Sequence, residues 1–278
     1  MIKFTRQIPC GKEKAYLNNR LAGKVAFITG AGSGLGRSMA LCMAQEGASI
    51  AIADINLANA RKVANEIRAG KGKALAIKVD VRKSTQVAKA VQQTLKRFGK
   101  IDIVVNDAGT GGEHIGPPLT DIPDEDFDSI FDINVKGIFI VCKAVMPHMK
   151  QRKSGKIINI SSVAGKKPST SIPLYSASKA AVIVFTQVLA EELGPFNIQV
   201  NAICPGIIWT PMWHDYAGKL TEKIPGLKGQ DPAVAFKAIT TAPRENIQRV
   251  QRPEDIAMLA VFLASDESIR ITAEAISV

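Results

Sequence analysis

The hydrophobic positions of the chain gather in short unbroken runs, which longer stretches of mixed polarity separate. Unbroken apolar runs are typical of strands buried on both faces of a parallel sheet, and such a run occurs at 25–29. Shorter stretches that are mainly apolar predict further strands at 49–53, 74–79, 101–105, 156–160 and 198–203. Apolar residues recur at helical spacing in the stretches between, at about 35–45, 57–69, 84–98, 124–149 and 175–193. A short helix at 253–263 and a last strand at 269–278 complete the predicted elements.

Regular alternation of strands and helices predicts one large α/β domain. The expected architecture is a single Rossmann-type, doubly wound parallel sheet with helices on both faces. We expect this domain to span residues 23–278, after a basic arm at 1–22 that shows no periodicity. Residues 207–251 contain several prolines, and we predict that they form an irregular substrate loop or lid.

The first predicted strand leads into a glycine-rich turn and then a helix, which is the context that a dinucleotide-binding fingerprint requires. The turn reads Thr29-Gly30-x-x-x-Gly34-x-Gly36. Glycines at such positions let the backbone turn tightly and approach a pyrophosphate at the helix N-terminus. The predicted cofactor contacts in this turn are Gly30, Ser33, Gly34, Leu35 and Gly36.

Asp54 ends the second predicted strand, 24 positions after Gly30. An acidic residue at this place accepts hydrogen bonds from the adenosine ribose hydroxyls and repels a 2′-phosphate. Neither Ser33 nor Ile55 supplies a positive charge that could hold such a phosphate. The sequence therefore favours NAD (NADH) over NADP.

Tyr175 and Lys179 are four residues apart in a predicted helix, so they lie on one face, one turn from each other. An ammonium beside a phenol favours the phenolate, and we expect the Tyr175 pKa to fall from about 10 toward neutral pH. A phenol tuned in this way can exchange a proton with a substrate oxygen. This spacing is common in helices, and its meaning depends on the other motifs.

Five signals in order give the chain a resemblance to the short-chain dehydrogenase/reductase family over residues 21–278. They are the glycine turn with Thr29, Asn106-x-Ala108-Gly109, Asn134, Ser162 thirteen residues before Tyr175-x-x-x-Lys179, and Pro205-Gly206 followed by Thr210. The resemblance implies that the nicotinamide carries the hydride while the protein orients and polarises the substrate.

The resemblance also implies a role for each matching residue. Tyr175 is expected to be the general acid/base, and Lys179 to lower its pKa and bind the nicotinamide ribose. Ser162, in preference to its neighbour Ser161, would stabilise the substrate oxygen, and Asn134 would hold a water that links Lys179 to solvent. Further cofactor contacts implied are Asp80, Val81, Asn106, Ala108, Gly109, Pro205, Gly206, Ile208 and Thr210.

Two positions depart from the family pattern. Asp107 stands where the family usually has a second Asn, and a buried carboxylate there needs hydrogen-bond donors around it. Ala273 stands where Gly is usual.

Composition narrows the choice of partners. The net charge is +11, of which the first 20 residues contribute +4, yet no aromatic residues interleave the basic clusters, so no nucleic-acid partner is expected. The sequence contains no run of 18 apolar residues, so no membrane span is expected. Four scattered cysteines favour buried thiols in a cytoplasmic enzyme. No cluster has metal-ligand spacing, and for the loop residues His114 and His214 both solvation and substrate contact remain open.

Three functions stay open. The turn at 204–213 resembles that of the polyol and diol branch (sorbitol-type, butanediol and acetoin dehydrogenases), which implies an NAD-dependent enzyme for a small secondary alcohol or ketone. The alternative is a 3-oxoacyl-thioester (acyl carrier protein) reductase that docks its carrier on Arg152-Lys153 and Lys156. The third is a non-catalytic nucleotide-binding protein on the same fold. The resemblance also implies a homotetramer formed through the long helices at 124–150 and 175–193.

Overall fold

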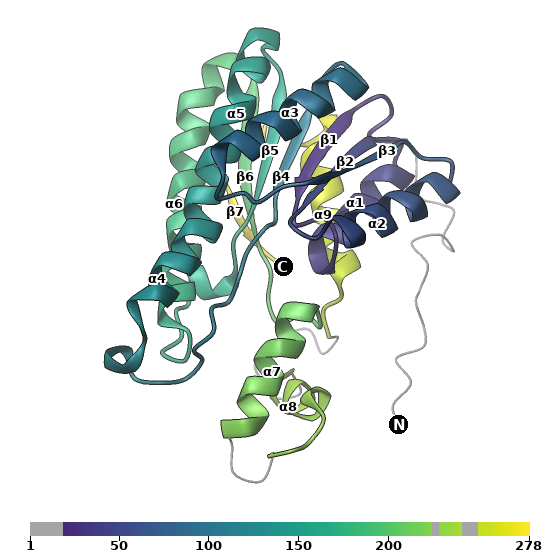
Figure 1. The fold of residues 1–278 in the computed structure, drawn as a ribbon. Coiled ribbons are helices and arrows are strands. Elements are labelled where there is room, and N and C mark those ends of the chain that lie inside the picture. The colour runs from purple at the N-terminus through teal and green to yellow at the C-terminus, as the bar shows by residue number, and fades with distance from the viewer. Residues whose placement is uncertain (1–18, 224–227, 241–249) are drawn as a thin grey trace.

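A parallel sheet runs through the centre of the computed structural model, which describes residues 19–223, 228–240 and 250–278 (Figure 1). Its strands are β1 (Val25–Thr29), β2 (Ser49–Asp54), β3 (Ala74–Lys78), β4 (Ile103–Asn106), β5 (Gly155–Ile160), β6 (Ile198–Cys204) and β7 (Ala275–Ser277). They pair in the order β3-β2-β1-β4-β5-β6-β7, with every neighbour parallel. The predicted doubly wound sheet is confirmed.

Helices cover both faces of this sheet. One face is covered by α1 (Gly34–Gln45), α2 (Leu57–Ala69) and α9 (Pro253–Ala264), and the other by α3 (Ser84–Phe98), α5 (Gly137–Arg152) and α6 (Pro173–Leu193) (Figure 1). Helix α4 (Asp124–Phe131) precedes α5. The predicted helices therefore lie where the apolar periodicity put them.

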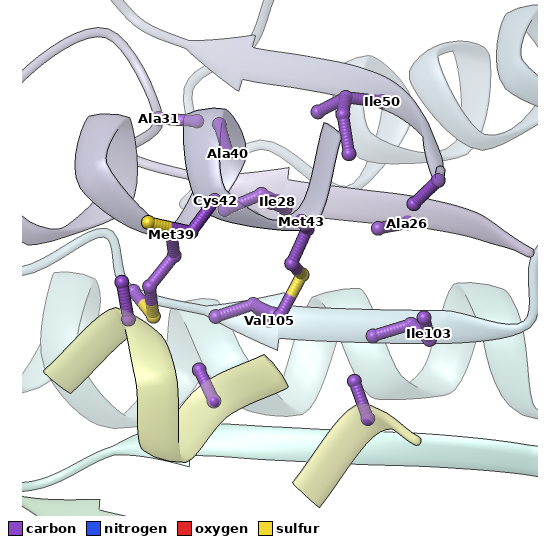
Figure 2. Close-up of a cluster of buried hydrophobic side chains, with 14 of the residues drawn as sticks. Ala26, Ile28, Ala31, Met39, Ala40, Cys42, Met43, Ile50, Ile103 and Val105 are labelled. Carbon is purple, nitrogen blue, oxygen red and sulfur yellow. The ribbon is translucent and has the colours of Figure 1, made fainter. Parts of the chain in front are cut away.

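Strand β1 shows why the strands read as unbroken apolar runs. Ala26 and Ile28 point into the core beneath α1, where they meet Met39 and Met43 (Figure 2). Phe27, the residue between them, packs into the core on the opposite face. Since successive side chains of a strand alternate between faces, burial of both faces favours apolar residues along β1. The buried Thr29 at its end hydrogen-bonds through its hydroxyl.

The prediction of an irregular segment at 207–251 is wrong for much of its described part. Helices α7 (Pro211–Lys223) and α8 (Pro232–Thr240) occupy it. Each begins at a proline, and proline suits the first position of a helix because the N–H it lacks has no partner there anyway. The two prolines of this segment that lie among the described residues, Pro211 and Pro232, are therefore helix starts.

The last predicted strand is shorter than expected, because only Ala275–Ser277 pair as β7. Ala273 interrupts the run with a φ of 65°, the left-handed conformation that glycine adopts without strain. Its N–H still donates to Val200 O at 2.8 Å, so the chain approaches β6 before it becomes regular.

The predicted N-terminal arm lies mostly outside the described residues. Its described end is attached to the domain: Leu21 is fully buried, and Arg20 forms an ion pair with Glu267 at 2.7 Å. Cys42, Cys142 and Cys204 are buried, as expected, and Cys10 lies in the undescribed part.

One described stretch, Pro173–Phe196, is long and apolar enough to cross a membrane by length and composition alone, with a mean hydropathy of 1.2. Core helices of globular proteins meet the same criteria. Val182, Leu189 and Leu193 of this helix are buried in the core against the sheet.

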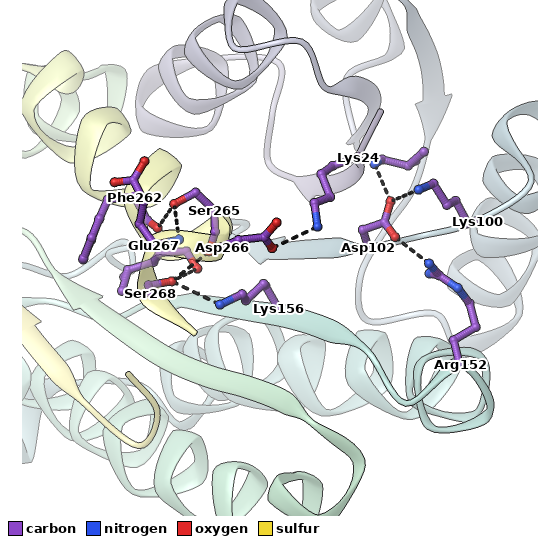
Figure 3. A network of polar contacts seen from close by, with 12 residues as sticks. Lys24, Lys100, Asp102, Arg152, Lys156, Phe262, Ser265, Asp266, Glu267 and Ser268 are labelled. Atoms are coloured by element: carbon purple, nitrogen blue, oxygen red, sulfur yellow. Dashed lines mark hydrogen bonds and ion pairs between the residues drawn. The ribbon is translucent and has the colours of Figure 1, made fainter. Parts of the chain in front are cut away.

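Asp102 organises a polar network (Figure 3). The network lies at the amino-terminal ends of the strands, whereas the glycine turn lies at their carboxyl ends. The Asp102 carboxylate accepts hydrogen bonds from Val25 N at 2.8 Å and Arg152 Nη2 at 2.7 Å, and Lys100 Nζ lies 3.1 Å away. Burial raises the pKa of Asp102. Arg152, the Val25 N–H and Lys100 together lower it by a larger amount, so the pKa lies below its usual value.

Asp102→Ala is expected to lower the free energy of unfolding by about 2–3 kcal/mol at neutral pH, because it removes the acceptor of a buried N–H and a guanidinium. Since the Asp102 pKa is depressed, this difference from wild type should begin to shrink below about pH 4 and be lost as the pH falls through that depressed pKa. Urea denaturation followed by circular dichroism measures it. Asp266→Ala is the control, because that carboxylate pairs with Lys24 but is 75% exposed. Equal losses in the two variants would contradict the assigned role of Asp102.

Candidate active site

The glycine turn after β1 meets the loop after β4 at the point where the strand order reverses. Gly30 has a φ of 67°, and a Cβ built on it would lie 2.8 Å from Ala108 N. Thr29 Oγ1 accepts hydrogen bonds from the Asp107 and Ala108 N–H groups, each at 3.2 Å. Crevices at such reversal points are where doubly wound sheets bind ligands.

The N-terminus of α1 opens onto this crevice, and of its first-turn N–H groups that of Gly36 donates to the Asp107 carboxylate. Ser33 occupies the capping position, but its hydroxyl accepts no hydrogen bond from the first turn. Uncapped N–H groups and the positive end of the helix dipole favour an anion. The turn therefore fits a pyrophosphate. The residues predicted to contact it lie at this helix start, with Ser33 at the capping position and Gly34, Leu35 and Gly36 in the first turn.

The carboxylate of Asp54 reaches from the end of β2 to the glycine turn. Its Oδ2 accepts a hydrogen bond from Gly32 N and its Oδ1 one from Asn56 N, each at 2.8 Å. These donors hold Asp54 at the edge of the crevice. Arg37, the nearest cation along the turn, is ion-paired with Glu66.

Three other predicted cofactor residues make contacts within the protein. Asp80 binds the guanidinium of Arg82, which holds the pKa of that carboxyl below its usual value. Val81 is buried against Gly137. Asn106 donates to Asn159 Oδ1 at 2.8 Å inside the sheet, so its amide supports the strands.

Asn134 lies on a π-helical segment, Asp132–Lys136, that interrupts the predicted helix at 124–149. Its Oδ1 accepts from Thr110 N at 2.8 Å, and its Nδ2 donates to Thr110 O and Ser178 Oγ, each at 3.0 Å. A Cβ built on Gly109 would lie 3.2 Å from Asn134 Oδ1 and 3.5 Å from Lys179 Nζ. The π segment, a feature frequent at functional sites, thus brings Asn134 beside Lys179.

Ser162, Tyr175 and Lys179 come together at the carboxyl end of β5. The Ser162 and Tyr175 side chains are hydrogen-bonded, and Lys179 Nζ lies 5.6 Å from the centre of the Tyr175 ring. Lys179 Nζ also donates to Ile160 O at 2.8 Å. Ser161 Oγ instead donates to the backbone oxygen of Lys179 at 2.7 Å, which agrees with the preference for Ser162.

The expected fall in the Tyr175 pKa is wrong for this structure. Burial raises it to about 12, and this exceeds the lowering by the Ser162 hydrogen bond. Burial also lowers the pKa of Lys179 to about 8, although the negative charge of Asp107 opposes this. The sequence argument counted the neighbouring charge but not the loss of hydration, and at neutral pH Tyr175 is a neutral phenol.

The loop after β6 connects the crevice to helices α7 and α8. Pro205 O accepts from Val163 N at 3.0 Å, Gly206 N donates to Gln251 at 3.2 Å, and Ile208 is buried. Thr210 Oγ1 accepts from Trp213 N at 3.3 Å, so its hydroxyl caps α7. A Cβ built on Gly34 would lie 3.7 Å from the Thr210 side chain, which places α7 over the glycine turn.

Aromatic side chains form the core of the α7–α8 pair. Trp209 and Phe236 have ring centroids 4.7 Å apart, and Trp213 lies 4.6 Å from Tyr216 and 5.9 Å from Phe236. His214 packs its ring on Trp209 at 5.6 Å. Sequence analysis missed this helix pair, although Trp209, Trp213 and Tyr216 recur at helical spacing.

Lys219 of α7 bridges the crevice to the loop after β4. Its Nζ lies 3.0 Å from the Glu113 carboxylate and 2.9 Å from that of Asp215. In the same loop, His114 Nδ1 lies 2.9 Å from Asp126 Oδ2. Sequence analysis missed Asp126, which carries no motif and becomes significant only because α4 folds against this loop.

Asp107 is a half-buried carboxylate that lies against the glycine turn, beside Gly36. The Gly36 N–H donates to it, and a Cβ built on Gly36 would lie 2.6 Å from its Oδ2. Burial raises the pKa of Asp107 to about 7, although Lys179 and the Gly36 N–H oppose this. The required donors are thus present but do not fully compensate the lost hydration.

The chain matches the short chain dehydrogenase family over residues 24–220. It is 37% identical over 259 residues to the 3-oxoacyl-(acyl-carrier-protein) reductase FabG of Thermotoga maritima, covering 93% of this chain and 97% of that protein. It is 37% identical over 254 residues to the (S)-acetoin-forming diacetyl reductase of Staphylococcus epidermidis, covering 91% and 96%.

Among solved structures, that of an NAD⁺-bound xylitol dehydrogenase is similar, with a TM-score of 0.84 and 33% identity over 92% of this chain and 98% of that one. A crevice that fits a dinucleotide, beside a half-buried Tyr175 and a buried Lys179, defines the class of protein as an oxidoreductase. The chain belongs to the short chain dehydrogenase family.

Asp107→Asn tests the titration of the Asp107 carboxylate. Because folding disfavours the ionised form of Asp107, the wild-type free energy of unfolding should fall relative to the variant between pH 4 and pH 7. The relative fall is expected to reach about 1.4 kcal/mol per pH unit, the slope for one proton. Denaturant titrations at several pH values measure it, and parallel pH profiles of the two proteins would contradict the raised pKa.

Proposed function

We propose that the chain is an NAD(H)-dependent oxidoreductase that interconverts a small secondary alcohol and its ketone, of the polyol, diol or acetoin type. The observation that carries the proposal is the grouping of Ser162, Tyr175 and Lys179. These side chains lie at the crevice between the glycine turn and the loop after β4. The NAD⁺-bound xylitol dehydrogenase and the diacetyl reductase support this substrate class and this cofactor.

The residues of the crevice fit a dinucleotide. The open N-terminus of α1 suits its pyrophosphate, and the fixed carboxylate of Asp54 suits its adenosine ribose. Lys179 and Thr210 border the part of the crevice that remains for the nicotinamide half. When bound, the nicotinamide supplies or accepts the hydride.

Within this mechanism Tyr175 acts on the substrate oxygen. As a neutral phenol hydrogen-bonded to Ser162, Tyr175 donates a proton to a ketone oxygen as negative charge develops there. The hydroxyl of Ser162 stabilises the same oxygen. The positive charge of Lys179 stabilises the phenolate that remains after the proton is donated. Lys179 and Asn134 lie close together, and through water between them and the solvent the phenolate regains its proton.

We propose that α7 and α8 form the substrate lid of the domain. The aromatic side chains between them give the lid a stable core, and Lys219 attaches it across the crevice to Glu113. The apolar lid supports a small substrate enclosed in the crevice rather than one held at an open surface.

The carrier-protein reductase is the second candidate, supported by the relative from Thermotoga maritima and by the basic surface. Of the three basic residues that favoured carrier docking, Lys153 is exposed, whereas the charges of Arg152 and Lys156 are engaged within the protein. Arg152 pairs with Asp102, and the buried Lys156 donates to Ser268 at 3.1 Å. Arg152 ends α5 and Lys156 lies at the start of β5, so both are at the end of that strand opposite Tyr175. We therefore favour the small alcohol or ketone.

A homo-oligomer is part of the proposal. Phe127 and Phe139 on α4 and α5, and Val184 and Val188 on α6, are exposed apolar residues on the helices expected to form the interface. Burial of such a surface stabilises an assembly. A homotetramer and a cytoplasmic location stay predictions, and sedimentation determines the number of subunits.

Tyr175→Phe and Lys179→Ala should each reduce kcat for ketone reduction with NADH by roughly 10²–10⁴-fold, the range that general acid catalysis supplies. Steady-state assays on diacetyl, acetoin and a polyol panel measure the rates. Circular dichroism and NADH fluorescence check that the variants fold and bind cofactor. Retention of more than a tenth of the wild-type rate would refute the role of either residue, and a wild type inactive on the whole panel would refute the proposed function.

Asp54→Ala should relax the cofactor preference. Removal of the carboxylate deletes charged hydrogen bonds and ends repulsion of a 2′-phosphate, so the kcat/KM ratio of NADH to NADPH should fall about tenfold or more. Asp54→Glu keeps the charge and serves as the matched control. An unchanged ratio in Asp54→Ala would exclude Asp54 as the selecting residue.

A further inference from the structure

A small pocket lies between the start of α6, helix α4 and the loop after β4. Leu174 and Tyr175 line it from α6, Asp126 from α4, and Gly111 and His114 from the loop. His114 therefore shares a pocket with the residue that donates the proton in the proposed mechanism, although no step of that mechanism uses it.

Asp126 fixes both the loop and the imidazole of His114. Its Oδ2 lies 3.0 Å from His114 N and 2.9 Å from His114 Nδ1, and its Oδ1 accepts from Glu113 N at 3.4 Å. The Asp126 side chain is only 8% exposed, whereas that of His114 is 46% exposed. The carboxylate thus anchors a ring that stays open to the pocket.

The charge state of Asp126 determines which ring nitrogen is available. Burial raises the pKa of Asp126. The backbone N–H groups of His114 and Glu113, together with the His114 ring, lower it by a larger amount, so the carboxylate is ionised at neutral pH. An ionised carboxylate only accepts, which places a hydrogen on Nδ1. Nε2 has no hydrogen-bond partner among the described residues. It can accept from a hydroxyl when the ring is neutral and donate to a carbonyl when the ring is protonated.

We propose that His114 selects substrates with a second oxygen next to the reacting carbon, through a hydrogen bond between its Nε2 and that oxygen. The inference rests on the proposed function and narrows it to hydroxyketones, diketones and diols over alcohols and ketones with one oxygen. Asp126 is the positioning residue, since it acts through the His114 ring that it holds.

Acetoin and 2-butanone form a matched substrate pair, because they differ only in the hydroxyl beside the ketone. The experiment measures kcat and KM for NADH-dependent reduction of both by wild type, His114→Leu and His114→Gln. Leucine keeps apolar bulk without a hydrogen-bonding group, and glutamine restores one. Reduction of 2-butanone serves as the control for folding and cofactor binding within each variant.

Wild type should prefer acetoin in kcat/KM by about tenfold or more, the effect of one good hydrogen bond. His114→Leu should lose that preference, mainly through a higher KM for acetoin, while its 2-butanone reduction stays within about twofold of wild type. His114→Gln should regain part of the preference. Equal losses on both substrates, or an undiminished preference in His114→Leu, would overturn the inference while leaving the proposed function intact.

Asp126→Asn separates positioning from contact. It leaves one acceptor oxygen where the carboxylate has two, and its amide NH2 can donate to Nδ1 instead of accepting from it. The acetoin preference should therefore fall less than in His114→Leu, with little change on 2-butanone. A wild type that reduces neither ketone nor any other carbonyl compound with NADH would refute the proposed function, and this inference with it.

Discussion

The buried ammonium of Lys179 is the constraint on which the site depends. Removing a charge from water is costly unless it is hydrogen-bonded and paired, and Lys179 is only 4% exposed. The carbonyl of Ile160 accepts from it, Asn134 and Gly109 adjoin it, and the charge of Asp107 attracts it. Accommodating this one group draws the loops after β4 and β5 toward α6, and Tyr175 follows one turn earlier on the same helix.

Burial sets the proton state of the site more strongly than the neighbouring charge does. It raises the Tyr175 pKa to about 12 and lowers that of Lys179 to about 8. Tyr175 therefore holds its proton at neutral pH, which suits donation to a ketone, the reducing direction. The Lys–Tyr spacing alone had suggested the opposite shift, because sequence distance shows which charges are neighbours but not how much water remains around them.

Local patterns predicted the sheet, the glycine turn and the carboxylate at the end of β2, since each depends on residues close in sequence. Features that depend on distant segments escaped prediction. The π segment at Asn134, the Asp126–His114 pair and the ion pair that occupies Arg152 arise only when α4, α5 and β4 pack. The helices α7 and α8 were missed for another reason, because prolines that start helices also resemble loop residues.

The central claim is that the crevice beside Tyr175 transfers a hydride between nicotinamide and a small carbonyl compound. The most direct measurement is mass spectrometry of the product formed from diacetyl and NADH deuterated at both C4 positions. The account predicts acetoin that carries one deuterium on its carbinol carbon. Acetoin without deuterium, or no reduction of diacetyl or any other small carbonyl compound, would contradict it.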